Sequence, residues 1–303
     1  MKVLITGGNG FIGIKLVKAL LKKNYEVRVF DNLSKGKNRL PDEVEFIQGD
    51  LRNKEDIDKA TKDVDYVFHK AAVAINRSLE FPEESLDINL KGSFNVFESC
   101  LKNKVKKVIF SSSASVYGNP EKLPVNEDDK KNPVTPYCIS KLASEYLLKF
   151  FSEQGLNYIV LRYFNVYGEG QNLDAFYTSV VDKFVEKVLN NESPEIHGSG
   201  DQSMDMVHVN DIIKADIKAM ESDVVNEVFN VGSGKQTTVK ELAEEILRLL
   251  DKKLEVKYVK RDVIASRRQA DVSKIKKMLD WETEVSVEDG LKEIIDIYKN
   301  ENI

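Results

Sequence analysis

The stretch Gly7-Gly8-Asn9-Gly10-Phe11-Ile12-Gly13 decides the fold of this chain. It joins a short apolar run, Val3–Thr6, to a helical pattern, Ile12–Lys23. Glycines at this spacing allow a tight turn and a close approach of the backbone to a pyrophosphate at a helix N-terminus. A simple Gly-rich turn can show the same spacing, but a strand–turn–helix context at the start of a βαβ unit favours dinucleotide binding.

The first half of the chain alternates short β-branched runs with helical patterns such as Glu83–Lys102. That alternation indicates a parallel sheet with helices on both faces. The expected strands are Val3–Thr6, Glu26–Phe30, Val44–Gln48, Tyr66–His69, Lys107–Ser111 and Tyr158–Tyr163. We therefore predict an α/β chain with a Rossmann-type, doubly wound parallel sheet.

The second strand leads into Asp31, where a carboxylate can accept hydrogen bonds from an adenosine ribose. An acidic group there repels a 2′-phosphate, which favours NAD over NADP. Lys35, Lys37 and Arg39 follow, so NADP stays open at this point. Gly49-Asp50-Leu51 ends the third strand, where the adenine edge is expected.

The candidate chemistry is carried by Thr135-Pro136-Tyr137-Cys138-Ile139-Ser140-Lys141. Thr135 can cap a helix, and Pro136 suits its first turn. Tyr137 and Lys141 then lie one turn apart on the same helix face. The ammonium is expected to lower the phenol pKa from its usual value of about 10, so that Tyr137 can take a proton from an alcohol. A Tyr and a Lys packed side by side on a solvated helix would show the same spacing.

Composition limits the class of protein. The 303 residues, 42% hydrophobic and 31% charged, suffice for one large α/β domain or a domain with an added lobe. Two cysteines and three scattered histidines give no reason to expect disulfides or a metal site. The net charge of −5 gives no reason to expect nucleic acid. With no signal peptide and no apolar run near the ~20 residues that span a bilayer, we expect a cytoplasmic protein without a membrane partner.

Ser111-Ser112-Ser113 closes the fifth strand, at the sheet edge where doubly wound folds bind ligands. With the glycine turn and the later Tyr-x-x-x-Lys, the sequence resembles an extended short-chain dehydrogenase/reductase. More narrowly, it resembles the nucleotide-sugar 4-epimerases of the UDP-galactose/UDP-glucose type. The resemblance covers nearly the whole chain and rests on Thr6–Gly13, Asp31–Leu33, Gly49–Arg52, His69–Ala72, Asn89–Gly92, Phe110–Gly118, Tyr137–Lys141, Leu161–Gly168 and Phe229–Gly232.

This resemblance implies an enzyme that uses NAD to epimerise a UDP-sugar at C4 through a 4-keto intermediate. By position it implies that Ser113 is the catalytic serine, Tyr137 the base and Lys141 the lysine that binds the nicotinamide ribose. It also implies substrate contacts from Ser113, Asn165 and Arg261. The cofactor contacts that it implies come from Gly7, Gly10, Phe11, Ile12, Gly13, Asp31, Asn32, Ser34, Lys35, Gly36, Asp50, Leu51, Lys70, Ala71, Ala72, Asn89, Ser111, Tyr137, Lys141 and Tyr163.

One departure from the family concerns the substrate diphosphate. Met204 stands where the family usually has an arginine before Asp205. Arg261 keeps the spacing of a second family arginine to Asp271, and Arg267 or Arg268 could supply the missing charge. Solvated surface arginines are the alternative for all three.

The regular alternation of strand and helix patterns ends after Gly168. We expect 1–168 to form an NAD-binding domain, with segments near 205–232 returning to it, and 169–204 with 233–303 to form a smaller substrate-binding lobe. Val207–Val209 and Val228–Val231 are the expected returning strands. The lobe is expected to hold a helix around Ala175–Leu189, a capping box of Thr238 with Glu241, a strand at Glu255–Val259, and a core of Trp281 with Leu291, Ile294, Ile295 and Tyr298.

Other properties follow only from the resemblance. It implies a homodimer that pairs through helices at Glu84–Lys102 and Pro136–Gln154. Two other functions remain open: a nucleotide-sugar 4,6-dehydratase or decarboxylase, and a non-catalytic NAD(H)-sensing protein on the same fold. The first usually carries acidic residues where this chain has Ala114 and Ser115, and the second usually lacks the Tyr or the Lys.

Overall fold

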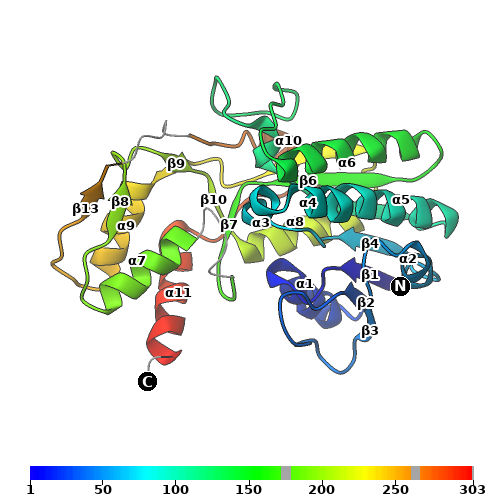
Figure 1. Ribbon diagram of the computed structural model, residues 1–303, viewed down its shortest axis with the longest axis horizontal. Helices are drawn as coiled ribbons and strands as arrows, with labels where there is room; N and C mark the ends of the chain where they lie inside the picture. Colours follow the sequence, from blue (N-terminus) through cyan, green and yellow to red (C-terminus); the bar gives the residue numbers. More distant parts are fainter. Residues whose placement is uncertain (172–178, 261–266, 302–303) are drawn as a thin grey trace.

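A seven-stranded, fully parallel sheet forms the centre of the computed structural model, which describes residues 1–171, 179–260 and 267–301 (Figure 1). Its strand order is β11-β6-β5-β4-β1-β2-β3. The strands are β1 (Lys2–Thr6), β2 (Glu26–Asp31), β3 (Glu45–Gln48), β4 (Tyr66–His69), β5 (Lys107–Ser113), β6 (Tyr158–Tyr163) and β11 (Glu227–Val231). All six expected strands of the first half are confirmed to within two residues. The doubly wound parallel sheet is therefore confirmed.

Helices cover both faces of this sheet, because alternate residues of each buried strand point to opposite sides. Val3 and Ile5 of β1 pack in a core with α1 (Phe11–Lys22), α8 (Val209–Glu221) and α10 (Ser273–Leu279). Leu4 packs on the other side, in a core with α2 (Lys54–Ala60), α5 (Gly92–Lys102) and α6 (Pro136–Ser152). No helix in the described ranges is long and apolar enough to span a bilayer.

The helix expected at Glu83–Lys102 is divided into three parts. After α3 (Ile75–Glu80), α4 (Pro82–Leu86) leads into a π-helical turn, η1 (Asp87–Lys91), and then into α5. Asn89 in this turn is buried; its side chain accepts a hydrogen bond from Val73 N at 2.7 Å and donates one to Val73 O at 3.0 Å. The wider π turn therefore ties the helix to the backbone that follows β4.

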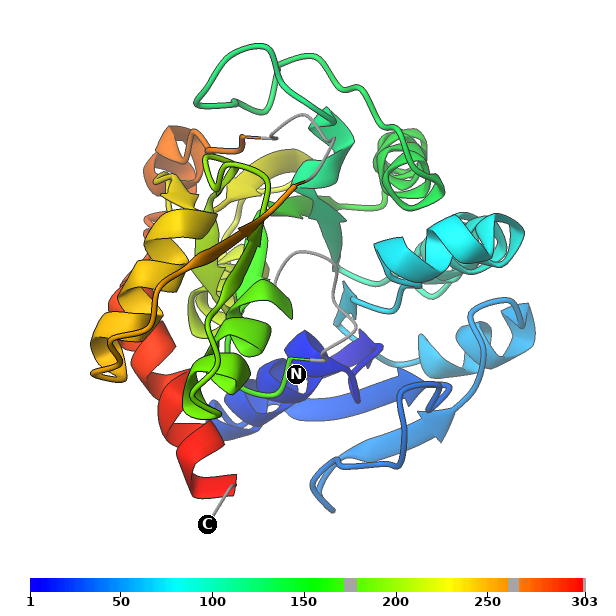
Figure 2. The ribbon, with the colours of Figure 1, turned by 60° about the vertical axis from the view of Figure 1, so that its left-hand side comes forward.

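A smaller lobe lies beside the sheet, at the left of Figure 1. Figure 2 shows α7, α9 and α11 next to one another, and their apolar faces share one core. Thr238 and Glu241 form the expected capping box of α9. The elements of the lobe are α7 (Ser179–Leu189), β8 (Glu195–His197), β9 (Ser203–Met204), β12 (Thr237–Thr238), α9 (Val239–Leu249), β13 (Lys257–Val259) and α11 (Val287–Glu301).

Two expectations for the second half are wrong. Strand β10 (Met206–His208) does not return to the main sheet; it pairs with β7 (Asn165–Tyr167) in a separate two-stranded sheet. Trp281 does not belong to the lobe core. It packs with the residues around Val3 and Ile5, and its Nε1 donates to Asp211 O at 3.0 Å. The Leu291, Ile294, Ile295 and Tyr298 stripe of α11 does pack in the lobe, as expected.

Candidate active site

A cavity of about 340 Å³ lies at the carboxyl ends of β1 to β4. Parallel doubly wound sheets bind ligands at this edge. The expected cofactor residues that line it are Gly7, Gly10, Asp31, Asn32, Ser34, Lys35, Asp50, Leu51, Lys70, Ala71 and Ala72. Gly49, Arg52, Val73, Ala74 and Arg77 also line it, and so do Phe30, Glu84 and Ile88, which sequence reasoning missed.

The glycine turn leaves bare backbone at the floor of this cavity. Gly7 has φ +71°, and a Cβ there would lie 2.7 Å from Ala71 N. A Cβ on Gly13 would overlap the carbonyl oxygen of Gly7. Among the described residues, no side chain caps the first turn of α1 at Gly10. A close-packed turn followed by an uncapped helix N-terminus fits the pyrophosphate of a dinucleotide.

Asp31 ends β2 and lines the cavity, where sequence reasoning put it. Its two carboxylate oxygens accept hydrogen bonds from Asn9 N at 3.0 Å and Leu33 N at 2.8 Å. Asn9 is a buried residue that sequence reasoning missed. Its Oδ1 accepts a hydrogen bond from Arg39 N, and its backbone carbonyl oxygen accepts one from Arg39 Nη2 at 3.1 Å. Arg39 is therefore held against the glycine turn, whereas Lys35 lines the cavity.

The structure brings the three candidate catalytic side chains together at the end of β5. Ser113 ends that strand, and the turn η2 (Ala114–Tyr117) follows it. Thr135 caps α6 through Cys138 N, so that Tyr137 lies in the first turn, as expected. Ser113 is the polar neighbour whose side chain lowers the pKa of the Tyr137 phenol. Lys141 Nζ donates to Ser111 O at 2.7 Å and lies 5.7 Å from the centre of the Tyr137 ring.

Burial dominates the electrostatics of this cluster. It raises the pKa of Tyr137 to about 12, although the Ser113 hydrogen bond acts in the opposite direction. The expected lowering of the Tyr137 pKa by Lys141 is therefore wrong for these side chains on their own. Burial lowers the pKa of Lys141 to about 7; the charge of Lys70 lowers it further, and that of Glu145 opposes the shift. Near neutral pH, Lys141 carries only part of a positive charge.

Lys70 follows β4 and belongs to a buried cluster behind the cavity. Its Nζ donates to Asp216 Oδ1 and to the Tyr163 hydroxyl, both at 2.5 Å. The Tyr163 hydroxyl accepts also from Ser111 Oγ at 3.3 Å and donates to Asp216 Oδ1 at 2.5 Å. Lys70, Ser111 and Tyr163 are expected cofactor residues that the fold brings together. Asp216 was missed, since an acidic residue in an amphipathic helix gives no signal of its own.

A second buried ion pair supports the helix that carries Tyr137. Arg162 of β6 binds Glu145 of α6 through Nε at 3.0 Å and Nη2 at 2.6 Å. Ser112 donates to the same carboxylate, and the Tyr117 hydroxyl accepts from Arg162 Nη1 at 2.7 Å. This network fixes α6 against the strands β5 and β6, and hence fixes Tyr137 relative to Ser113.

Of the three expected substrate contacts, Ser113 and Asn165 lie within the described residues. Asn165, at the start of β7, is buried, and its Oδ1 has no hydrogen-bond partner in the part of the chain that the structure describes. Arg261 lies outside the described residues. Arg267 forms a β-bridge with Ser203, and Arg268 N donates to Ser203 O at 3.2 Å, so both arginines lie beside β9, the strand that ends at Met204.

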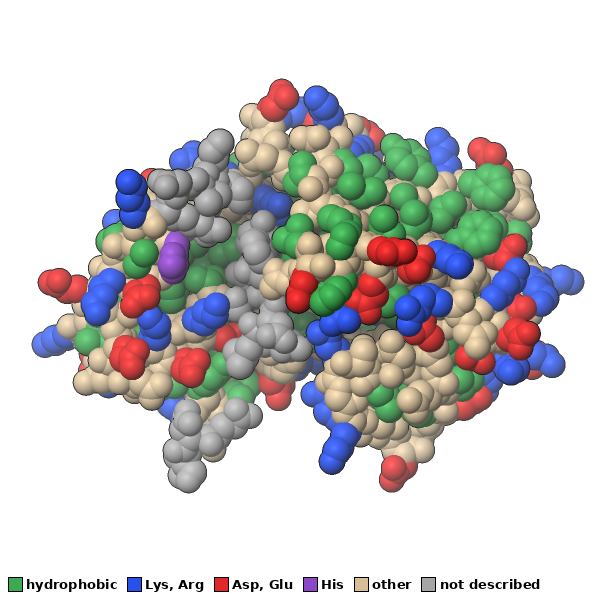
Figure 3. Space-filling view, in the orientation of Figure 1, with side chains coloured by type: hydrophobic (Ala, Val, Ile, Leu, Met, Phe, Trp, Pro, Cys, Tyr) green, Lys and Arg blue, Asp and Glu red, His purple; other side chains and the backbone are tan. Residues whose placement is uncertain are grey.

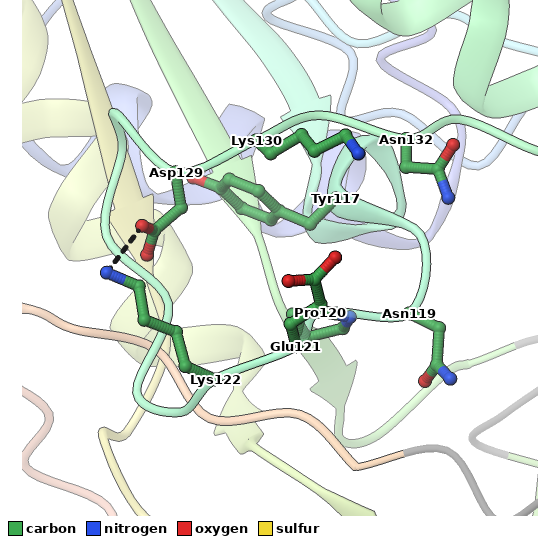
Figure 4. A pocket seen from close by; sticks show the side chains of 8 residues that line it. All are labelled: Tyr117, Asn119, Pro120, Glu121, Lys122, Asp129, Lys130 and Asn132. Carbon is green, nitrogen blue, oxygen red and sulfur yellow. Dashed lines mark ion pairs between the residues drawn. The ribbon is translucent and has the colours of Figure 1, made fainter.

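Another cavity, of about 390 Å³, lies beside η2 (Figure 4). An ion pair between Lys122 and Asp129, 2.9 Å long, crosses one side of it. Its lining contains no glycine turn and none of the expected site residues. The residues are Tyr117, Asn119, Pro120, Glu121, Lys122, Asp129, Lys130 and Asn132. The chemistry of the lining therefore favours the cavity at β1 to β4 as the cofactor site.

Known proteins resemble this chain over almost its full length. Residues 3–232 match the NAD dependent epimerase/dehydratase family. The structure is similar to that of UDP-glucose 4-epimerase with UDP-glucose from Thermotoga maritima, with a TM-score of 0.93, 36% identity and 100% of both chains covered. It is also similar to UDP-N-acetylglucosamine 4-epimerase from Methanobrevibacter ruminantium M1 in complex with UDP-N-acetylmuramic acid (TM-score 0.92, 38% identity, 99% of this chain and 98% of that chain). A UDP-N-acetyl-alpha-D-glucosaminuronate decarboxylase of Bacillus cytotoxicus is 31% identical over 315 residues, 98% of each chain.

Proposed function

This chain belongs to the NAD dependent epimerase/dehydratase family, with NAD as its cofactor, and from that premise we propose that it epimerises a UDP-sugar at C4. The observation that carries the proposal is the cluster of Ser113, Tyr137 and Lys141 at the carboxyl edge of the sheet. It lies on the fold whose glycine turn and Asp31 line a cavity that fits a dinucleotide. An alcohol, a hydride acceptor and a tyrosine base are the requirements of a transient oxidation.

In the proposed mechanism, Tyr137 takes the proton of the sugar 4-hydroxyl, and the Ser113 hydroxyl bridges the two oxygens. Burial holds the phenol in its neutral form, so Tyr137 needs positive charge nearby in order to act as a base. Lys141, when protonated, supplies part of that charge. NAD, when bound, supplies a hydride acceptor for C4 and a further positive charge. After the sugar has presented its other face, Tyr137 returns its proton to the 4-keto oxygen. The hydride taken up by the cofactor would return to C4 on that face, so NAD would be regenerated and no external redox partner would be needed.

The identity of the sugar is the finer part of the proposal. The similar solved structures are named as epimerases of UDP-glucose and of UDP-N-acetylglucosamine. We propose UDP-glucose/UDP-galactose as the substrate pair. Asn165 is proposed to contact the substrate because its buried amide oxygen has no partner in the described part of the chain. Arg261 is proposed to bind the diphosphate, with Arg267 or Arg268 as a second contact, because a diphosphate needs cationic partners.

A decarboxylase remains the second candidate, because one relative bears that name. Decarboxylation and dehydration need further acid or base groups next to the sugar. The two residues after Ser113 are Ala114 and Ser115, and both are buried. The Ser115 hydroxyl donates to Ser113 Oγ at 2.9 Å, so it is engaged with the catalytic serine. These residues favour the epimerase over the decarboxylase.

We also propose a homodimer. Four large apolar side chains are exposed on α5 and α6: Phe94, Ile139, Tyr146 and Phe150, at 36%, 45%, 64% and 54%. Figure 3 shows hydrophobic side chains gathered over this part of the molecule. An exposed apolar patch on two parallel-lying helices suits pairing with the same patch of a second copy about a two-fold axis.

We also propose which parts of the chain bind the cofactor and which bind the substrate. Residues 1–168, with segments near 205–232, would hold NAD, and residues 169–204 and 233–303 would bind the sugar nucleotide. Ser113 and Tyr137 belong to the first part, whereas the arginines near β9 belong to the second.

Incubation of the purified protein with NAD and UDP-glucose tests the function. Formation of UDP-galactose, followed by anion-exchange chromatography and proton NMR, is the expected result. A 4-keto-6-deoxy sugar would indicate a dehydratase, and a UDP-pentose formed from UDP-glucuronate would indicate a decarboxylase. An absence of turnover with a panel of UDP-glucose, UDP-N-acetylglucosamine, UDP-glucuronate and UDP-pentoses, while NAD still binds, would favour the sensing protein.

A further inference from the structure

Lys70 and Asp216 form an ion pair whose side chains are almost completely buried. The two side chains are 3% and 0% exposed, and they come from the end of β4 and the middle of α8. The Tyr163 hydroxyl, at the end of β6, contacts both groups at 2.5 Å. Three elements that are distant in the sequence therefore meet at one charged point behind the cofactor cavity.

This pair is costly to bury. The free-energy cost of moving two charges out of water is offset only in part by their mutual attraction. A buried pair therefore often stabilises a fold no more than apolar residues of the same size would. Asp216 Oδ2 has no hydrogen-bond partner among the described residues, so the pair is not fully compensated. Its neighbours in α8, Ile212, Ile213 and Ala215, are apolar core residues. Packing alone therefore gives no reason for an acid at position 216.

Contacts through Ser111 connect this pair to the candidate catalytic lysine. Lys141 Nζ donates to Ser111 O at 2.7 Å, and Ser111 Oγ donates at 3.3 Å to the Tyr163 hydroxyl, which contacts both members of the pair. Burial lowers the pKa of Lys141, and Lys70 is the charged neighbour with the largest further lowering effect. The other titratable groups around Lys141 are Tyr137 and Glu145 on its own helix and His69 at the end of β4. Burial lowers the pKa of His69 to about 3, so the imidazole is neutral near pH 7. Asp216 and Tyr163 contact Lys70 directly.

We propose that Asp216 and Lys70 are positioning residues for the candidate active site. Asp216 holds the Lys70 ammonium and the Tyr163 hydroxyl in place, and Lys70 sets how much charge Lys141 carries near neutral pH. The inference rests on the proposed role of Lys141 beside Tyr137. The charge of Lys70 would thus act on Lys141, in addition to the position of Lys70 in the lining of the cofactor cavity.

The direct test is a titration of Lys141 in the full chain by NMR of lysines labelled with 13C at Cε, with Lys141→Met to assign the signal. The variant Lys70→Met/Asp216→Asn removes both charges and keeps nearly the same volume. We expect the Lys141 titration midpoint to rise by about one pH unit. Lys70→Gln/Asp216→Asn is the second variant, in case the first does not fold.

Lys107→Met is the matched control. Lys107 is another buried lysine, but its Nζ binds Ala219 O and Ser222 O at the end of α8, outside the cofactor cavity. The control should leave the Lys141 midpoint unchanged. An unchanged midpoint in the folded double variants would overturn the inference.

Activity gives an independent readout. In the double variant, the pH profile of kcat should move to higher pH together with the Lys141 midpoint. Because the NMR titration needs no substrate, it decides the inference even if the wild-type protein turns over no UDP-sugar. In that case the proposed function fails by itself, and the two failures are distinguished.

Discussion

Replacement of Tyr137 by Phe tests the proposed chemistry most directly. The change removes one oxygen from a half-buried side chain and keeps the ring that Lys141 faces. Since burial keeps the phenol neutral, its loss leaves no unpaired charge in the site. A single hydrogen bond is worth about 1 kcal/mol of folding stability, so removing the phenol oxygen beside Ser113 costs little. The fold and NAD binding should therefore survive.

Turnover, in contrast, should nearly stop. Loss of a general base typically lowers the rate by about 10²–10⁴-fold. This corresponds to a rise of roughly 3–5 kcal/mol in the activation barrier. The fall should appear in kcat for conversion of UDP-glucose to UDP-galactose, while the affinity for NAD stays close to that of the wild type.

Tyr146→Phe is the matched control, because Tyr146 lies on the same helix and is 64% exposed. It should keep wild-type kcat. The assay is the rate of UDP-galactose formation with saturating NAD, together with NAD titration by quenching of intrinsic fluorescence. A Tyr137→Phe enzyme within tenfold of the wild-type kcat would refute Tyr137 as the base.

Three other changes test separate parts of the structure. Asp31→Ala should weaken NAD binding by about tenfold or more and reduce discrimination against NADP, as measured by parallel titrations, because it removes a ribose acceptor and a repulsive charge; unchanged affinities would place Asp31 outside the site. Burial lowers the pKa of the His69 imidazole to about 3. The folding stability that depends on a neutral His69 is therefore fully present above about pH 6.5 and is lost as the pH falls toward 3, by up to roughly 5 kcal/mol. Urea unfolding at pH 7 and pH 4 should show a smaller acid loss in His69→Gln than in the wild type, and equal losses would contradict the cause. Phe150→Glu should convert the proposed dimer to a monomer in sedimentation velocity, and a dimer that persists would show that this face of α6 is not the interface.

Local sequence signals predicted the sheet and much of the site. The glycine turn, the acid that ends β2 and the Tyr-x-x-x-Lys of α6 all depend on short-range patterns, and short-range patterns are visible in a sequence. Thr135 and Thr238 cap the helices that they were expected to cap, for the same reason. Each of these features involves residues within one or two turns of one another.

The features that the sequence did not reveal depend on contacts across the fold. Asp216 contacts Lys70 across 146 positions, and Glu145 meets Arg162 between a helix and a strand. Burial raises the pKa of Tyr137, and burial cannot be inferred from the spacing between two residues in the sequence. Trp281 was assigned to the wrong core because its neighbours in the chain belong to the C-terminal half.

The position of Trp281 has a consequence for how the chain folds during synthesis. The core around Val3 and Ile5 also contains Ile275, Leu279 and Trp281, which leave the ribosome long after the first half of the chain. The region that matches the family ends at residue 232, so a nascent chain of that length lacks the last part of this core. Contacts between such distant residues form late and leave apolar surface uncovered until they do. A chain that is released before Trp281 emerges should therefore aggregate or be degraded, although every strand of its main sheet has already been made.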